Sequence, residues 1–159
     1  MDFHNEPAST KTLSEAEMER LVLLRYWLTG WETRNSHHWQ QAWRQLTRSY
    51  EPAAARQVIA ALETFVRSIA AEATGNFFFH RPCCGHLSDH ERLLLDMISL
   101  KHSASLYARC SEMLDPGGVA PVLGNAQRLC AALELAAFEP VGRTAQPLVH
   151  REEGALRPH

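Results

Sequence analysis

Five side chains that could bind a metal ion lie within one short stretch of this sequence. They are His80, Cys83, Cys84, His86 and His90. Zinc in proteins prefers thiolate and imidazole ligands, and a short loop loses little entropy when it closes around an ion. We therefore expect a transition-metal site here, with zinc as the ion, whose occupancy falls at acid pH as its ligands become protonated.

The spacing of these ligands, H-x2-C-C-x-H-x3-H, differs from that of the common zinc fingers and ribbons. Those sites draw on two separated ligand pairs, and this sequence contains no C-x-x-C pair. Adjacent residues point in different directions, so we expect one of Cys83 and Cys84 to bind the ion. The other ligands are then His80, His86 and His90, and a residue from another helix can complete the set.

Local signals give this loop a defined shape. Ser88 and Glu91 form the S-x-x-E pattern of a helix capping box, which places His90 in the first turn of the following helix. Gly85 allows a tight turn just before His86. The two imidazoles are therefore expected to approach the same ion.

A metal-free loop is the first alternative. Free cysteines are frequently small buried apolar residues, and histidines are common near the start of a helix. The three phenylalanines at positions 77–79 would then close one end of a helical bundle. Short ligand patterns of this kind also arise by chance.

A reactive thiol is the second alternative. The helix N-terminus near Ser88 and the side chain of Arg81 would both favour the thiolate form of Cys83 or Cys84. Such a cysteine could sense an oxidant. A Cys-His enzyme is the weakest form of this hypothesis, because the sequence supplies no recognisable orienting partner or oxyanion hole.

The elements that must position this loop belong to one domain. A chain of 159 residues, with 45% hydrophobic and 21% charged residues, is typical of one globular domain with a substantial core. Its net charge of -2 argues against nucleic acid as the partner, because nucleic-acid-binding domains usually carry a basic excess.

The cysteines and the apolar runs indicate the compartment. Four cysteines, two of them adjacent, do not form a disulfide framework. The first residues lack the basic and then apolar order of a secretory signal, and no apolar run is long enough to cross a bilayer. We expect a cytoplasmic protein without a membrane segment.

Apolar residues recur at helical spacing along most of the chain. The pattern predicts helices over residues 14–30, 36–50, 52–73, 89–114 and 122–137. The predicted fold is an all-α antiparallel bundle of about five helices, with the Cys/His-rich loop between helices three and four. A flexible lead over residues 1–12 and a disordered tail over residues 140–159 flank the helical domain over residues 13–139.

Two features of the first two helices concern binding. The apolar surface of the first helix is widened by Leu23 and Trp27, which indicates contact with two neighbours or with a partner. The tryptophans at positions 31, 39 and 43 could form an interface, but their helical spacing favours a place in the core. His37 and His38 are expected in solvent, although either could reach an ion held by the loop.

Three functional hypotheses follow. The first is a small accessory or regulatory protein whose loop binds zinc, for structure or to sense metal or redox state. The second is a metal-free helical module that binds another protein, or a second copy of itself. The third and weakest is a thiol-dependent enzyme that uses Cys83 or Cys84. We favour a protein that is not an enzyme.

Overall fold

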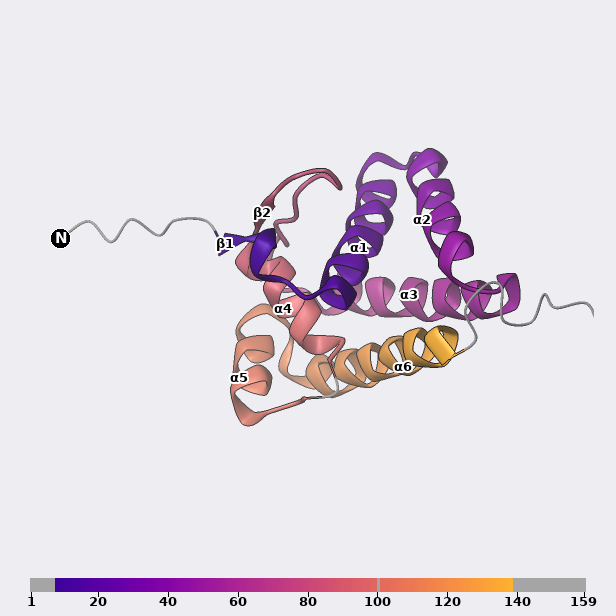
Figure 1. Ribbon diagram of the computed structural model, residues 1–159. Coiled ribbons are helices and arrows are strands. Elements are labelled where there is room, and N and C mark those ends of the chain that lie inside the picture. Colours follow the sequence, from indigo (N-terminus) through magenta and orange to yellow (C-terminus); the bar gives the residue numbers. More distant parts are fainter. Residues whose placement is uncertain (1–7, 100, 139–159) are drawn as a thin grey trace, which may run out of the picture.

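The computed structural model describes residues 8–99 and 101–138, and this part of the chain is essentially all-α (Figure 1). Its helices are α1 (Glu15–Thr33), α2 (Ser36–Ser49), α3 (Pro52–Glu72), α4 (Asp89–Met97), α5 (Ala104–Met113) and α6 (Val119–Phe138). Short 3-10 helices are η1 (Thr10–Thr12) and η2 (Pro116–Gly118), and the strands β1 (Ala8–Ser9) and β2 (His86–Leu87) have two residues each. The predicted fold class is confirmed, with the Cys/His-rich loop between α3 and α4.

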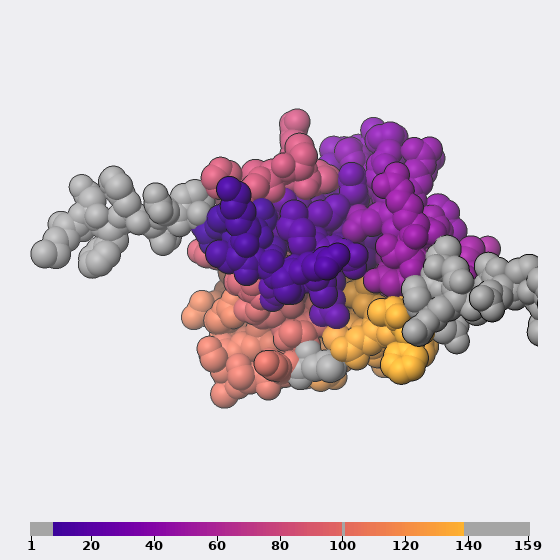
Figure 2. Space-filling model, in the orientation of Figure 1, coloured from indigo at the N-terminus to yellow at the C-terminus, as the bar shows by residue number. Residues whose placement is uncertain are grey.

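The helices are arranged around an antiparallel pair, α3 and α6, which run side by side (Figure 1). The hairpin of α1 and α2 stands on this pair, while α4 and α5 lie at the other end. In the space-filling view α1 in indigo lies between α2 in purple and the rose segment that precedes β2 (Figure 2). The first helix is thus central to the fold.

Apolar side chains from all six helices fill the core. On α3 and α6, Leu62, Phe65 and Val122 are fully buried. Leu23 and Trp27 of α1 are buried as well, and α1 as a whole contacts α2, α3 and α4. The wide apolar surface of the first helix is therefore covered by neighbouring helices inside the protein.

Local side chains cap the helix starts, and at α4 they form the capping box that the sequence predicts. Ser14 with Glu17, and Ser88 with Glu91, form complete capping boxes at α1 and α4, and Pro52 occupies the first turn of α3. At α2 the cap is Asn35, whose side chain accepts from the His37 N–H. These local contacts satisfy backbone N–H groups that a helix cannot satisfy itself.

The helix predicted over residues 89–114 is two helices. After α4 ends at Met97, the ring of His102 lies 2.8 Å from the Met97 carbonyl oxygen. Ser103 then caps α5 through its side chain. His102 consequently lies between the two helices, while Cys110 is buried in α5. The apolar residues keep their helical spacing through residues 98–103, so the spacing alone did not predict the break between α4 and α5.

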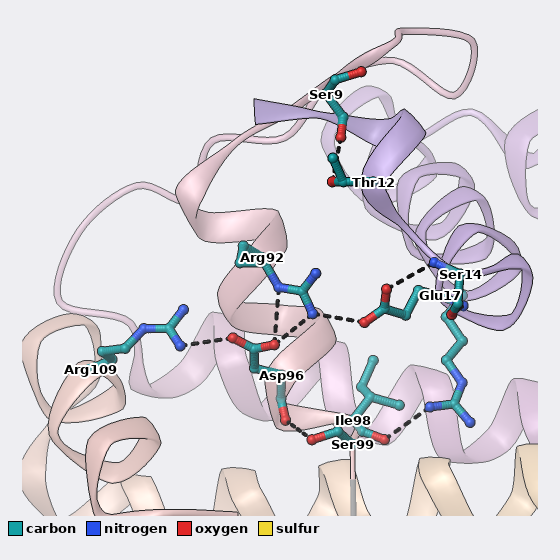
Figure 3. A network of polar contacts seen from close by, with 10 residues as sticks. Ser9, Thr12, Ser14, Glu17, Arg92, Asp96, Ile98, Ser99 and Arg109 are labelled. Atoms are coloured by element: carbon teal, nitrogen blue, oxygen red, sulfur yellow. Dashed lines mark hydrogen bonds and ion pairs between the residues drawn. The ribbon is translucent and has the colours of Figure 1, made fainter. Parts of the chain in front are cut away.

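Charged side chains hold α1, α4 and α5 together at the surface (Figure 3). Arg92 pairs with Glu17 at 3.0 Å and with Asp96 at 2.6 Å, and Asp96 also accepts from Arg109 at 2.8 Å. The hydrogen bond from Arg92 lowers the pKa of Glu17 below its ordinary value. Exposed pairs contribute up to about 1 kcal/mol each, so this network orients the helices more than it stabilises them.

The strands join the beginning of the described chain to the Cys/His-rich loop. β1 and β2 are antiparallel, with Ala8 opposite Leu87 and Ser9 opposite His86. The N–H of Thr10 also donates to the carbonyl oxygen of Gly85 at 3.0 Å. The lead predicted over residues 1–12 is thus in contact with the loop from Ala8 onward. Residues 1–7 and the tail predicted over 140–159 lie outside the described residues.

Gly30 allows α1 and α2 to approach closely. The first helix was expected to end near Gly30, yet it continues to Thr33. The indole of Trp39 from α2 lies against the Gly30 Cα, and a methyl group there would overlap that ring. The missing side chain therefore has a packing role inside the helix.

We predict that Gly30→Ala and Gly124→Ala change stability in opposite directions. Alanine gains about 1 kcal/mol over glycine inside a helix, but overpacking at Gly30 costs about 1–3 kcal/mol, so the net change should be destabilising. At Gly124 in α6 no atom lies within 4 Å of the new methyl group, so that variant should be stabilised. Urea unfolding followed by circular dichroism measures both changes, and equal stabilisation by both variants would contradict the close approach of Trp39.

Candidate functional site

A buried ion pair organises the loop that carries the predicted ligands. Arg25 of α1 and Glu91 of α4 are each 1% exposed. The guanidinium donates from Nε to Oε1 at 2.7 Å and from Nη2 to Oε2 at 3.0 Å. This two-point geometry is the strongest form of an Arg-carboxylate contact.

Both partners of the pair also hold the loop backbone. Arg25 donates to the carbonyl oxygen of Cys84 at 2.7 Å and to that of His86. Glu91 accepts from the N–H of His80 at 2.8 Å and from the N–H of Ser88 at 2.9 Å. Four backbone groups of the loop are thereby fixed to one buried pair, and a buried charge with all its hydrogen bonds satisfied can stay ionised.

The ionisation of Glu91 depends on these contacts. Burial opposes the charged form, but hydrogen bonds from Arg25, Ser88 and His80 outweigh it and lower the pKa of Glu91 below its ordinary value of 4.5. A carboxyl whose pKa is lower in the folded state contributes stability above its unfolded pKa. That contribution is lost as the pH falls through the folded-state pKa.

Among the predicted ligands, His90 is occupied by the loop itself. Its Nδ1 accepts from the Phe78 N–H at 2.7 Å, which leaves only Nε2 for another partner. Its ring stacks on Phe78 with centroids 5.6 Å apart and an angle of 10°, and Phe77 lies 5.0 Å away. His90 therefore holds Phe77 and Phe78 against the first turn of α4.

The structure brings His80 and His86 together, with ring centroids 6.3 Å apart. The Sγ atom of Cys84 accepts from the His86 N–H at 3.5 Å, whereas Cys83 is exposed. Within residues 8–99 and 101–138, no three His, Cys, Asp or Glu side chains are arranged so that they could hold a metal ion. The zinc site at these residues stays a prediction.

The other two cysteines are packing residues. Cys110 and Cys130 are fully buried, and burial raises the pKa of both thiols. A buried thiol of raised pKa is a poor nucleophile at neutral pH. Thiol chemistry, if the protein has any, thus falls to Cys83 and Cys84.

A second candidate site lies at the C-terminal end of α1. A hollow of about 410 Å³, which we call the tryptophan pocket, is lined by Trp27, Trp31, Arg34, Trp39, Glu63 and Arg67. The rings of Trp27 and Trp39 lie 5.8 Å apart, and the Arg67 guanidinium lies 5.8 Å from the Trp31 ring centroid. Aromatic walls with a few fixed polar groups are typical of binding pockets.

Glu63 of α3 fixes the walls of this pocket. Its Oε2 accepts from the indole N–H of Trp27 at 2.7 Å and of Trp31 at 3.1 Å, and its Oε1 accepts from Arg67. Burial opposes ionisation of Glu63, but these donors outweigh it and lower its pKa. The carboxylate therefore stays charged and holds two indole rings in place.

Arg34 has an unusual backbone at the rim of the pocket. It ends α1 in the left-handed region, with φ 53°, where glycine is the residue usually found. A side chain there costs about 1 kcal/mol or more. Among the described residues, Arg34 is the only non-glycine with positive φ. Such local strain is most frequent at functional sites.

Two further hollows continue this surface. An apolar groove of about 530 Å³ between α1 and α3 shares Trp31 with the tryptophan pocket. A hollow of about 500 Å³ beside the Cys/His-rich loop shares Glu32 and Phe79 with that groove and includes His38 and His80. We call the three together the α1 end face.

Neither the role of Arg25 nor the tryptophan pocket was predicted from the sequence. An arginine within the apolar stretch of residues 21–28 was the available signal for a buried ion pair. The tryptophans were assigned to the core, but Trp31, Trp39 and Trp43 are only partly buried and pack against its edge. Helical spacing shows which side of a helix faces inward, and it does not show where the neighbouring helix stops.

Comparison with known proteins finds no relative of this chain: no protein-family model, curated protein or solved structure matches it. Among the described residues, no helix combines the length and apolarity that crossing a bilayer requires. The chemistry of the residues must therefore carry the functional argument.

We predict that Glu91→Gln destabilises the protein far more than Glu17→Gln. Both residues complete capping boxes, but only Glu91 neutralises a buried arginine. Leaving a buried charge unpaired costs about 3–5 kcal/mol, whereas an exposed pair contributes at most about 1 kcal/mol. Urea unfolding measures the loss, and hydrogen exchange should show faster opening of residues 77–90 in Glu91→Gln only.

The pH dependence provides an independent readout of the same pair. Because the Glu91 pKa is lowered by folding, wild-type stability should fall below about pH 4.5, with a shallower fall in Glu91→Gln. The double variant Arg25→Met with Glu91→Met should stay destabilised, since the four backbone groups keep no partner. Full recovery by the double variant would show that the pair does not hold the loop.

Proposed function

We propose that this protein is a helical interaction module that binds a segment of another protein on the α1 end face. The observation that carries the proposal is the continuity of three hollows around the last two turns of one rigid helix. Apolar side chains dominate the central groove: Leu28, Trp31, Val66, Ile69, Ala70, Ala73, Phe77 and Phe79. Val66 and Ile69 are buried, and the others are partly or fully exposed. An apolar groove that opens at the surface is typical of a protein-binding site.

The rigidity of the surrounding elements supports this proposal. The groove is formed by α1 and α3, and the loop on its other side is fixed by Arg25 and Glu91. A surface that is already ordered loses little entropy when a partner binds, which favours affinity. The open aromatic rings are of the type that dominates binding energy at protein interfaces.

Metal binding by the loop is the second candidate function. It is favoured by the proximity of His80 and His86 and by His38, which lines the same hollow as His80. A thiolate of Cys83 or Cys84 would have to move toward the two imidazoles to complete a zinc site. This site would lie at one end of the α1 end face.

We predict that Ala70→Glu abolishes partner binding without affecting the fold. Ala70 is exposed on α3 and lines the groove, so a carboxylate there would be desolvated by any segment that binds. The expected loss of affinity is tenfold or more, because burying an unpaired charge costs about 2 kcal/mol or more. Quantitative capture from a lysate of the encoding organism measures the loss for each protein retained by the wild type.

Ala60→Glu is the matched control, since Ala60 is exposed on the same helix and lines none of the three hollows. It should retain the partners that Ala70→Glu loses, at an unchanged melting temperature. Sedimentation velocity of the three proteins tests the case in which the partner is a second copy. Identical capture and identical sedimentation for both variants would contradict binding on this face.

Metal content tests the second candidate. Protein purified untagged, under reducing conditions and without added metal, should contain about one equivalent of zinc by elemental mass spectrometry. His80→Ala and His86→Ala should lose the metal, and Cys83→Ser and Cys84→Ser identify the thiolate. A metal-free wild type whose melting temperature is the same with and without chelator would contradict zinc binding. The α1 end face would then remain as the candidate functional site.

A further inference from the structure

In the tryptophan pocket most hydrogen-bond acceptors already have partners, whereas arginine donors remain available. This difference indicates what the pocket can bind. The indole N–H groups of Trp27 and Trp31 donate to the carboxylate of Glu63. The indole N–H of Trp39 donates to the backbone carbonyl oxygen of Trp27 at 3.3 Å. Both oxygens of Glu63 are likewise engaged. A ligand therefore meets aromatic ring faces, and the one acceptor site left on Glu63 is on Oε1, which already accepts from Arg67.

The donors that remain belong to two arginines at the rim. Arg34 is exposed and makes no hydrogen bond or ion pair within the described part of the chain. Arg67 uses Nε for Glu63 and is 68% exposed, which leaves its two terminal nitrogens available. The charges of Glu63 and Arg67 cancel, so the unbalanced charge of the pocket is the guanidinium of Arg34.

Helix end charges do not change this balance. The C-terminus of α1 and the N-terminus of α2 meet beside the pocket, with Arg34 and Asn35 between them. Their partial charges are opposite and of similar size, so they largely cancel. A guanidinium carries a full charge and can donate two parallel hydrogen bonds to a carboxylate.

From this geometry we infer that the tryptophan pocket binds an acidic residue next to an aromatic side chain in the partner segment. The aromatic ring lies against Trp27, Trp31 and Trp39, and the neighbouring carboxylate pairs with Arg34. This inference rests on the proposed function and adds the chemistry of the segment. It also explains an arginine at a position where glycine would fit the backbone better.

Three blocked dipeptides with a negative, a neutral and a positive first side chain test the inference: N-acetyl-Asp-Phe-amide, N-acetyl-Asn-Phe-amide and N-acetyl-Lys-Phe-amide. Binding is followed through the indole N–H resonances of ¹⁵N-labelled full-length protein. We expect the Asp peptide to shift Trp27, Trp31 and Trp39, with a dissociation constant of about 1 mM, as for a ligand of this size. Trp43, which does not line the pocket, is an internal control.

Arginine variants assign the recognised charge. Arg34→Gln should weaken the Asp peptide about tenfold, which corresponds to about 1.4 kcal/mol, and should leave the Asn peptide unchanged. Arg48→Gln removes an exposed arginine at the end of α2, away from the pocket, and should change neither. Arg34→Gly should lose the Asp preference while its melting temperature is unchanged or higher, which a merely structural arginine would not give.

The outcomes separate this inference from the proposal on which it rests. Equal shifts by all three peptides, a preference for the Lys peptide, or no shift of the three tryptophans at about 20 mM, well above the expected constant, would each overturn the inference. In those cases partner capture that is sensitive to Ala70→Glu would still support the α1 end face. Peptide binding with the expected charge order, but capture unaffected by Ala70→Glu, would overturn the groove as the protein-binding surface instead.

Discussion

The buried contact between Arg25 and Glu91 is the constraint on which the rest of the structure depends. A buried ion pair alone adds little to stability, because desolvation cancels much of its attraction. Here the pair also satisfies four backbone groups of an irregular loop, from His80, Cys84, His86 and Ser88. An irregular loop lacks the regular backbone hydrogen bonds by which a helix or sheet satisfies its buried N–H and C=O groups. The pair therefore selects one conformation for a segment that otherwise has many.

The same physical device recurs at the tryptophan pocket. Glu63 collects donors from Trp27, Trp31 and Arg67, as Glu91 collects them from α1 and the loop. In both places one carboxylate fixes groups that are distant in the sequence, and its pKa is lowered by the donors that it holds. Because Arg25 and Trp31 belong to one helix, the loop and the pocket keep a fixed spacing. The carboxylates of Glu63 and Glu91 thus anchor two parts of the α1 end face to the same helix.

The parts of the structure that depend on neighbouring residues were predictable from the sequence. The capping box at Ser88 predicted the start of α4, and the helical spacing of apolar residues predicted α1, α2, α3 and α6. Contacts between distant residues were not predictable in the same way, because a 3.6-residue period says which face is apolar but not which partner covers it. Arg25 lies within an apolar stretch of the sequence, and its partner Glu91 is 66 residues away. The sequence singled out Trp31 and Trp39, but their helical spacing did not show that they are only partly buried and border a pocket.

The order of the loop bears on what a bound metal would do. In small zinc domains the ion provides the folding free energy, because nothing else fixes the ligands. Here Arg25, Glu91 and the stacked ring of His90 already hold the backbone between α3 and α4. An ion at His80 and His86 would thus bind a preformed frame and would only have to draw in a cysteine. Its effect would be confined to the side of the α1 end face that contains His80, where it could alter partner binding without altering the fold. Of the two roles considered for zinc, sensing fits this arrangement better than structural support.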